Sequence, residues 1–191
     1  LLALTVSFGL CACGGQSDST SGAKTDIKAE TGAENLSDTL VYAGENESTI
    51  NPVLSSHDEI VELVFSGLMK YDGNGIAEPD LAESCEYDEA ACTYTFHLKN
   101  GVKWHDGEAF TAKDVVFTYQ VLTEDETLTS SVTSNYEDIT DITAPDDETV
   151  VITLDKYCAN MPGYFTIGII PQHLLEGEDM NTTSFNQHPV G

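Results

Sequence analysis

The chain contains no arginine and only seven lysines against 33 acidic residues, so its 191 residues carry a formal net charge of -26. Nucleic-acid binding requires a basic surface, and this composition excludes it. The shortage of positive charge also argues against adsorption to anionic lipid head groups. An acidic surface can favour cationic ligands, but the simpler interpretation is a solvated surface that keeps the protein in solution.

The motifs of common enzyme classes are also missing. The chain has no Gly-x-Ser-x-Gly, no phosphate-binding glycine loop and no His-Glu-x-x-His, so hydrolase, nucleotide-binding and zinc-protease functions have no support. Residues 104–108 include His105 and Asp106, but their spacing matches no metal or acid–base geometry and indicates a turn. The acidic run 146–148 lacks the alternating spacing of a calcium loop. We therefore expect no catalytic residue, no cofactor and no metal site.

The N-terminal segment has the character of an export signal. Residues 1–10 are apolar and uncharged. They are too few to span a bilayer, which needs about 20 residues, but they suit the apolar core of a secretory signal. Neither a methionine nor a basic segment precedes Leu1. We therefore expect the chain to begin inside a signal peptide that covers residues 1–12.

A lipid-attachment pattern follows this apolar segment. Residues 10–15, Leu-Cys-Ala-Cys-Gly-Gly, resemble a bacterial lipobox in which Cys13 accepts the lipid. Two acyl chains on one cysteine anchor a protein stably, whereas a single chain binds only marginally. The alternative is an ordinary signal peptide with chance cysteines. Residues 13–37 are rich in Ser, Thr, Gly, Ala and acid, which predicts a flexible linker behind the lipidated cysteine.

Three cysteines lie beyond this linker. Cys85 and Cys92 flank a predicted hairpin connection, and export permits a disulfide. The two residues pair across the strands if the turn centres on Asp88 and Glu89, but a shift of one residue separates them. A Cys85–Cys92 disulfide and two half-buried free thiols therefore both remain open. Cys158 has no partner in the pattern, and no Cys/His spacing indicates zinc.

Hydrophobic periodicity predicts a mixture of short strands and amphipathic helices. Residues 93–98 alternate, with Tyr94, Phe96 and Leu98 on one face of a half-buried strand. A capping box at Ser56 and Glu59 predicts a helix over residues 57–69. The other predicted elements are a strand at 39–43, a helix from a cap at 111–114 to about Thr123, a hairpin of 138–144 and 149–154, and a short helix at 172–176 in which Pro171 is the first residue.

Residues 92–117 carry the most specific pattern of the chain. They read Cys-Thr-Tyr-Thr-Phe-His-Leu-Lys-Asn-Gly-Val-Lys-Trp-His-Asp-Gly, followed by Glu-Ala-Phe-Thr-Ala-Lys-Asp-Val-Val-Phe. This order resembles the signature region of the family 5 solute-binding proteins of ABC transporters, which include dipeptide, oligopeptide and nickel receptors. Residues 79–83 resemble that family's Pro-x-Leu-Ala-Glu element, and residues 188–191 resemble the start of its Pro-Val-Gly-Thr-Gly-Pro-Tyr segment.

The resemblance covers residues 39–191 and implies an α/β fold of the type II periplasmic-binding-protein class. It implies that the chain is roughly the N-terminal third of such a protein, truncated at both ends, so that the fold is partial. The first lobe would start in residues 38–56 and resume in residues 176–191. A mixed α+β subdomain at residues 57–175 would be inserted into it, and the second lobe would be missing.

The same resemblance implies a receptor that captures peptides outside the membrane and delivers them to the subunits of an ABC permease. It would act as a monomer, lipid-anchored in the periplasmic space or on the outer face of the plasma membrane. The loop after the first strand, Asn46, Glu47 and Ser48, would touch the peptide, with a plain surface loop as the alternative. Other receptors of the family would bind nickel, another metal chelate or oligosaccharides. A surface interaction module, or an inactive fragment without ligand capture, is the alternative of a different class.

Overall fold

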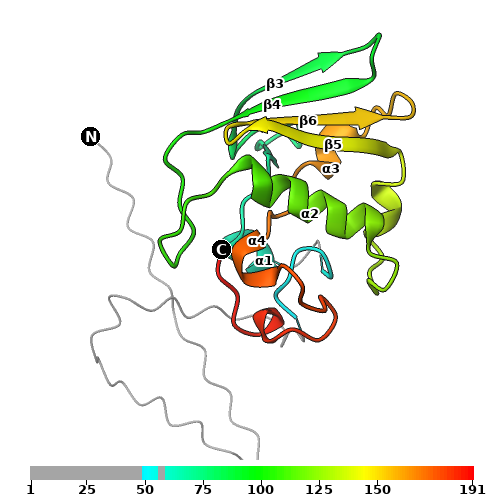
Figure 1. Ribbon diagram of the computed structural model, residues 1–191. Helices are drawn as coiled ribbons and strands as arrows, with labels where there is room; N and C mark the ends of the chain where they lie inside the picture. Colours follow the sequence, from blue (N-terminus) through cyan, green and yellow to red (C-terminus); the bar gives the residue numbers. More distant parts are fainter. Residues whose placement is uncertain (1–48, 56–58) are drawn as a thin grey trace, which may run out of the picture. The chain divides into compact units, whose positions relative to one another are not determined.

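A computed structural model describes residues 49–55 and 59–191 of the chain (Figure 1). The strand predicted at residues 39–43 and the cap residue Ser56 lie outside the described residues. The largest element is an antiparallel sheet with the strand order β3-β4-β6-β5. Its strands are β3 (Ala82–Asp88), β4 (Thr93–Leu98), β5 (Ile139–Asp146) and β6 (Thr149–Leu154).

The two central strands supply the buried face of this sheet. On β4 the buried side chains are Tyr94, Phe96 and Leu98, as the alternation of the sequence predicts. On β6, Val150, Ile152 and Leu154 are buried at the same alternate spacing. The predicted hairpin of β5 and β6 is confirmed, although β5 continues through Asp146. One apolar face therefore needs to be covered by other elements.

Helix α2 (Ala112–Glu124) covers part of that face and packs against β5 and β6 (Figure 1). Its predicted cap is confirmed, because the Thr111 amide donates to the Asp114 carboxylate at 2.9 Å. The inward side of the helix also carries polar groups with long-range partners. The second Asp114 oxygen accepts from the Gln172 amide at 3.0 Å, and the Thr118 hydroxyl accepts from the Ile170 amide at 3.0 Å. Helix α2 thus fixes the segment around residues 170–172.

Phe165 fills the space between the sheet and α2. Its side chain is fully buried, and its ring makes edge contacts with Tyr94 at 5.1 Å, Phe96 at 4.9 Å and Tyr119 at 6.0 Å between ring centroids. Edge-to-face pairs of this kind stabilise a core beyond the area that they bury. Phe165 follows the short helix α3 (Met161–Tyr164) directly. The segment 161–172 is therefore held by the sheet at one end and by α2 at the other.

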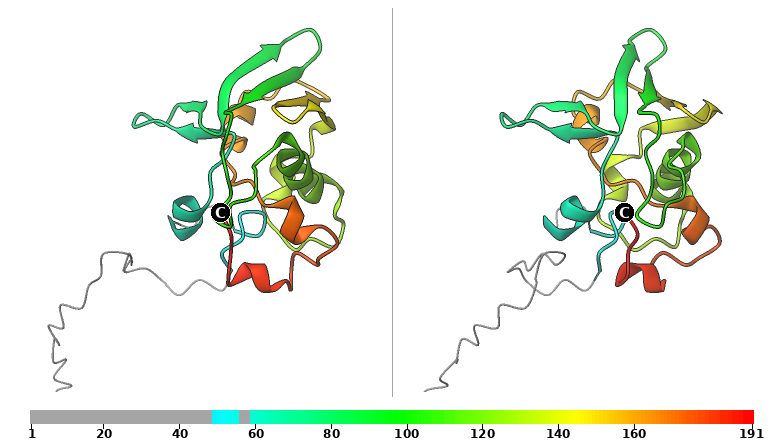
Figure 2. Two further views of the ribbon diagram at one scale, coloured as in Figure 1. Left: turned by 60° about the vertical axis from the view of Figure 1, so that its left-hand side comes forward. Right: turned by 90° about the vertical axis from the view of Figure 1, so that its left-hand side faces the viewer.

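A small two-stranded sheet, β1 (Met69–Tyr71) and β2 (Ala77–Pro79), extends away from the larger one (Figure 2). Its first strand corrects a prediction, because helix α1 (Glu59–Val64) ends before the predicted residue 69. The cause is pairing with a distant segment. The Met69 amide donates to the Phe165 carbonyl, and the Ile169 amide donates to the Ser66 carbonyl, both at 3.0 Å. These bonds require an extended chain where the hydrophobic periodicity indicated helix.

The remaining short elements lie before and after the β5–β6 hairpin in the sequence. The 3-10 turn η1 (Thr133–Asn135) precedes β5, helix α4 (Gln172–Leu175) follows Pro171, and the 3-10 turn η2 (Ser184–Asn186) lies near the end. Pro171 occupies the N-cap position of α4 and is not its first helical residue. The Ile50 amide donates to the Asn186 carbonyl at 2.7 Å, and the buried side chains of Asn51 and Asn186 bond at 2.9 Å. The first and last described segments therefore lie side by side.

The position of Asp114 leads to a stability prediction. Its replacement in Asp114→Ala removes the acceptor for the Thr111 and Gln172 amides, and we expect the free energy of unfolding to fall by about 2–4 kcal/mol. Urea denaturation followed by Trp104 fluorescence measures this. Lys113→Ala is the matched control, because that exposed side chain pairs only with exposed Asp147 and is expected to cost under about 1 kcal/mol. Equal losses in both variants would contradict the role of Asp114.

Candidate functional site

A hollow with a volume of about 410 Å³ lies between α1, β1 and the segment 163–168. Its walls combine aromatic rings, backbone and three charged side chains. Such a mixture of apolar surface with a few polar groups is typical of small-molecule sites. The lining residues are Pro52, Val61, Glu62, Phe65, Ser66, Gly67, Met69, Lys70, Tyr71, Asp80, Asn135, Tyr136, Gly163, Tyr164, Thr166, Ile167 and Gly168.

The floor of the hollow depends on two glycines that let backbone segments approach closely. A Cβ on Gly67 would lie 2.6 Å from the Thr166 carbonyl oxygen. A Cβ on Gly168 would lie 2.6 Å from the Phe65 Cβ and 2.9 Å from the Pro52 Cγ. Real Cβ atoms do not approach other heavy atoms this closely, so each position requires glycine. The floor is therefore fixed by packing between segments that are distant in the sequence.

Three tyrosines gather on one side of the hollow. Tyr136 is only 2% exposed, and its hydroxyl donates to the Tyr164 carbonyl at 2.9 Å. Burial raises the pKa of Tyr136 above its usual range, with smaller contributions from Tyr164 and Tyr71. The Tyr71 hydroxyl lies where a side chain on residue 163 would stand, so Gly163 makes room for it. Tyr71 itself is 56% exposed and can present its ring to a solute.

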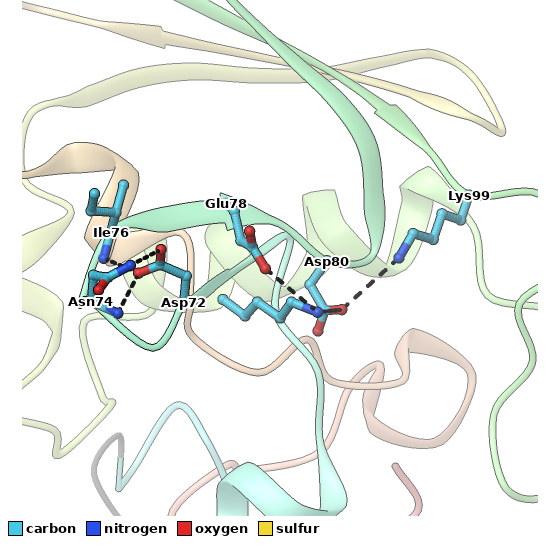
Figure 3. Close-up of polar contacts among 7 residues, drawn as sticks. Asp72, Asn74, Ile76, Glu78, Asp80 and Lys99 are labelled. Carbon is cyan, nitrogen blue, oxygen red and sulfur yellow. Dashed lines mark hydrogen bonds and ion pairs between the residues drawn. The ribbon is translucent and has the colours of Figure 1, made fainter.

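The two opposite charges that line the hollow near the small sheet are already paired. Lys70 lies 3.9 Å from Glu78 and 3.7 Å from Asp80, and Lys99 lies 4.0 Å from the same Asp80 oxygen (Figure 3). These pairs are partly exposed, so each contributes little to stability. Their consequence is electrostatic: neither Lys70 nor Asp80 presents an uncompensated charge to the hollow.

The turn that joins β1 to β2 is held by one carboxylate. Asp72 accepts from the amides of Asn74 and Ile76, each at 2.8 Å (Figure 3). The bond from Ile76, followed by those from the side chain and amide of Asn74, lowers the pKa of Asp72. All of these donors belong to the turn itself. Asp72 therefore shapes the hairpin and is not directed at a ligand.

The predicted contact loop Asn46, Glu47 and Ser48 lies outside the described residues. The described chain resumes immediately after it. Ile50 and Asn51 are fixed against Asn186, and Pro52 lines the hollow. Cys13 also lies outside the described residues.

The two hairpin cysteines are free thiols in the structure, as is Cys158. The sequence left a Cys85–Cys92 disulfide and two half-buried free thiols both open. The register pairs Cys85 with Phe96 and Asp88 with Thr93, so Cys85 does not lie opposite Cys92. Cys92 therefore belongs to the connection, where its φ is 51°. Burial, and to a lesser degree Glu86, raises the pKa of the Cys85 thiol to about 11. A thiol with so high a pKa is a poor nucleophile near neutral pH.

The segment 104–108 forms a turn, as its spacing indicated. The His105 amide donates to the Gly191 carbonyl at 2.8 Å, and the Gly191 amide donates to Nδ1 of His105 at 3.2 Å. The next residue, Asp106, lies 2.8 Å from His173. The hydrogen bond from His173, and then that from the Glu108 amide, lowers the pKa of Asp106. These contacts tie the turn to α4 and to the last residue.

Residues 49–55 and 59–191 contain no group of three or more His, Cys, Asp or Glu side chains arranged to hold a metal ion. The same residues contain no helix with the length and apolar character of a membrane span.

Comparison with known proteins places the chain in a family. Residues 77–191 match the model of the bacterial extracellular solute-binding proteins, family 5, middle region. The chain belongs to this family. It is 31% identical to the oligopeptide-binding protein AppA of Bacillus subtilis, over 95% of the chain and 34% of AppA. This family consists of extracellular or periplasmic solute-binding proteins that work with ABC permeases.

Solved structures of the family share the fold. The crystal structure of NikZ from Campylobacter jejuni with Ni(L-His) is 39% identical, with a TM-score of 0.73 over 77% of this chain and 30% of NikZ. The structure of AppA from Bacillus subtilis with a nonapeptide is 29% identical, with a TM-score of 0.69 over 76% of this chain and 31% of AppA. The fold is therefore that of a type II periplasmic binding protein, in part. The chain spans about a third of the length of these relatives.

The sequence did not reveal the residues of the hollow. Tyr71, Tyr136 and Tyr164 come from β1, from the end of η1 and from the end of α3, and no motif joins these three elements. The only local signal was glycine in apolar surroundings, at Gly67 and Gly168, where glycine often marks a close backbone approach.

The packing at Gly168 leads to a second stability prediction. In Gly168→Ala the added methyl group would meet Phe65 and Pro52, and overpacking of this kind lowers the free energy of unfolding by about 1–3 kcal/mol. Gly73→Ala is the matched control, because a Cβ at that position meets nothing within 4 Å, and its effect is expected to stay within about 0.5 kcal/mol. Urea denaturation of both variants checks this. A neutral Gly168→Ala variant would show that the floor of the hollow tolerates side chains.

Proposed function

We propose that the chain is part of the first lobe of an extracytoplasmic receptor that captures peptides and delivers them to an ABC permease. The observation that carries the proposal is the hollow with aromatic walls in a chain that belongs to a solute-binding family. AppA of Bacillus subtilis, whose structure contains a nonapeptide, resembles this chain in sequence and in fold. These likenesses support a peptide as the solute.

The chemistry of the hollow suits a site that selects solutes by binding them and does not react with them. Phe65 and Tyr71 offer ring surface on which the side chains of different peptides can pack. The Tyr136 hydroxyl is committed to the Tyr164 carbonyl, so the wall keeps its shape when no solute is bound. A preformed wall lowers the entropic cost of binding. A second lobe that closes over the solute would complete the site by a hinge motion.

We propose the division of the chain that the sequence suggested. Residues 38–56 and 176–191 would belong to the first lobe, and residues 57–175 would form the inserted subdomain. The bonds of Ile50 and Asn51 to Asn186 support this division, since they bring together the two segments that flank the insertion. Asn46, Glu47 and Ser48 would contact the peptide. The position of Pro52 in its wall, a few residues further on, supports that assignment.

A nickel chelate is the second candidate solute. The observation that favours it is the likeness to NikZ, which contains Ni(L-His) and has a higher identity and TM-score than AppA in the structural comparison. A chelate can be held through its organic ligand. The hollow would therefore need no protein side chain as a metal ligand.

The two solutes can be separated by thermal shift. We expect the full-length product of the gene that encodes this chain to gain thermal stability with a nonapeptide pool, because a ligand bound only by the native state stabilises it. At 100 times its dissociation constant the gain is about 2.7 kcal/mol. Nickel with L-histidine is the parallel arm, and nickel alone and L-histidine alone are its controls. A shift with Ni(L-His) and none with peptides would replace the first candidate by the second.

We also propose that Cys13 carries a lipid anchor behind a signal peptide at residues 1–12. The pattern Leu-Cys-Ala-Cys at residues 10–13 supports this, as does the extracellular family. The anchor would hold the receptor, as a monomer, close to its permease in the periplasm or on the outer face of the plasma membrane. It would also restore the membrane contact that the acidic composition disfavours.

The anchor can be tested by lipid labelling in a bacterial host. We expect the natural precursor to incorporate an alkyne-tagged fatty acid and the Cys13→Ser variant to lose the label, because the serine hydroxyl replaces the thiol that accepts the lipid. Cys11→Ser is the matched control and should keep the label, since residue 11 would be removed with the signal peptide. Label retained by Cys13→Ser would show that Cys13 is not the residue that carries the lipid.

A further inference from the structure

Glu62 differs from the other charged residues of the hollow. The charged side chains in its lining are Glu62, Lys70 and Asp80. Lys70 and Asp80 belong to the network with Glu78 and Lys99 (Figure 3), in which two positive and two negative charges balance. Glu62 has no ion pair with any described residue. The hollow therefore presents one uncompensated negative charge from its described lining.

The described lysines cannot supply the missing partner. Lys70 and Lys99 pair with Asp80, Lys113 pairs with Asp147, and Lys156 pairs with Asp138. The remaining described lysine, Lys103, does not line the hollow. Since the chain has no arginine, the described part of the protein leaves the Glu62 carboxylate available to a positive charge from outside.

The surroundings of Glu62 favour one kind of positive group. Phe65, Tyr71, Tyr136 and Tyr164 share the lining of the hollow with it. Aromatic rings attract ammonium and guanidinium groups through their electron-rich faces. A carboxylate in a hollow lined by such rings is the combination that binds an organic cation. A solute anion would gain nothing here, because Lys70, the one lysine in the lining, is neutralised by Glu78 and Asp80.

We propose that the hollow selects solutes with a cationic amine or guanidinium group, which contacts Glu62 beside the tyrosine wall. This inference rests on the proposed peptide capture and names the feature of the peptide that this lobe recognises. In a peptide, the group is a lysine or arginine side chain or the N-terminal ammonium. The competing interpretation is a solvated carboxylate in the first turn of α1, which would have no effect on solute preference.

The experiment uses the full-length gene product and calorimetric titration with alanine pentapeptides. In one series a lysine occupies each position in turn, and in the matched series the uncharged isostere norleucine replaces it. An N-acetylated pentaalanine tests the terminal ammonium against free pentaalanine. We expect at least one charged form to bind about 5-fold or more tightly than its neutral match, the size of one favourable charge pair with an aromatic neighbour.

The variants decide whether Glu62 is the cause. Glu62→Gln should remove this preference and leave the affinity for the neutral peptides unchanged. Glu126→Gln is the matched control, since that exposed residue lies outside the lining of the hollow and its replacement changes the net charge equally. The preference should persist in Glu126→Gln.

Three outcomes would overturn the inference. Equal binding of charged and neutral peptides at every position would reject cation selection while leaving peptide capture intact. A preference that persists in Glu62→Gln would move the selective group elsewhere. Failure of every pentapeptide to bind would reject the proposed peptide capture, and the inference with it.

Discussion

The contact on which the described structure depends is the one that Phe165 makes with two parts of the molecule at once. Its ring is buried against Tyr94, Phe96 and Tyr119, which fixes it between the sheet and α2. Its carbonyl accepts the Met69 amide, which fixes the start of β1. Through these two contacts the residue couples the core to the wall of the hollow. Burial of a phenylalanine side chain by itself contributes about 1.5–3 kcal/mol.

Consequences of that contact extend along both segments of the chain that meet at it. Because Met69 and Ser66 bond to the segment 165–169, α1 ends early and the chain turns into the small sheet. Gly67 and Gly168 permit the close approach that these bonds need. The buried groups of α2 hold the far end of the same segment through Ile170 and Gln172. A site wall built this way is rigid, since its backbone is bonded at several points and packed without space for a Cβ.

Charge organisation follows a similar logic on the surface. The chain is strongly acidic, yet most of its described lysines lie in ion pairs with specific carboxylates. Exposed pairs add little stability, but they determine where unbalanced charge remains. Around the hollow this leaves Glu62, and a residual charge at a binding surface contributes to discrimination among ligands.

The sequence alone determined what depends on neighbours along the chain. The alternation in β4, the cap at Thr111 and Asp114, the hairpin of β5 and β6, and the turn at residues 104–108 are all local patterns, and the ordered motif of residues 92–117 was enough for the family. Only the tertiary structure decided the end of α1, the register that separates Cys85 from Cys92, and the hollow with Glu62 and its tyrosines. Each of these depends on segments that meet only after folding, where backbone pairing and close packing outweigh local preference.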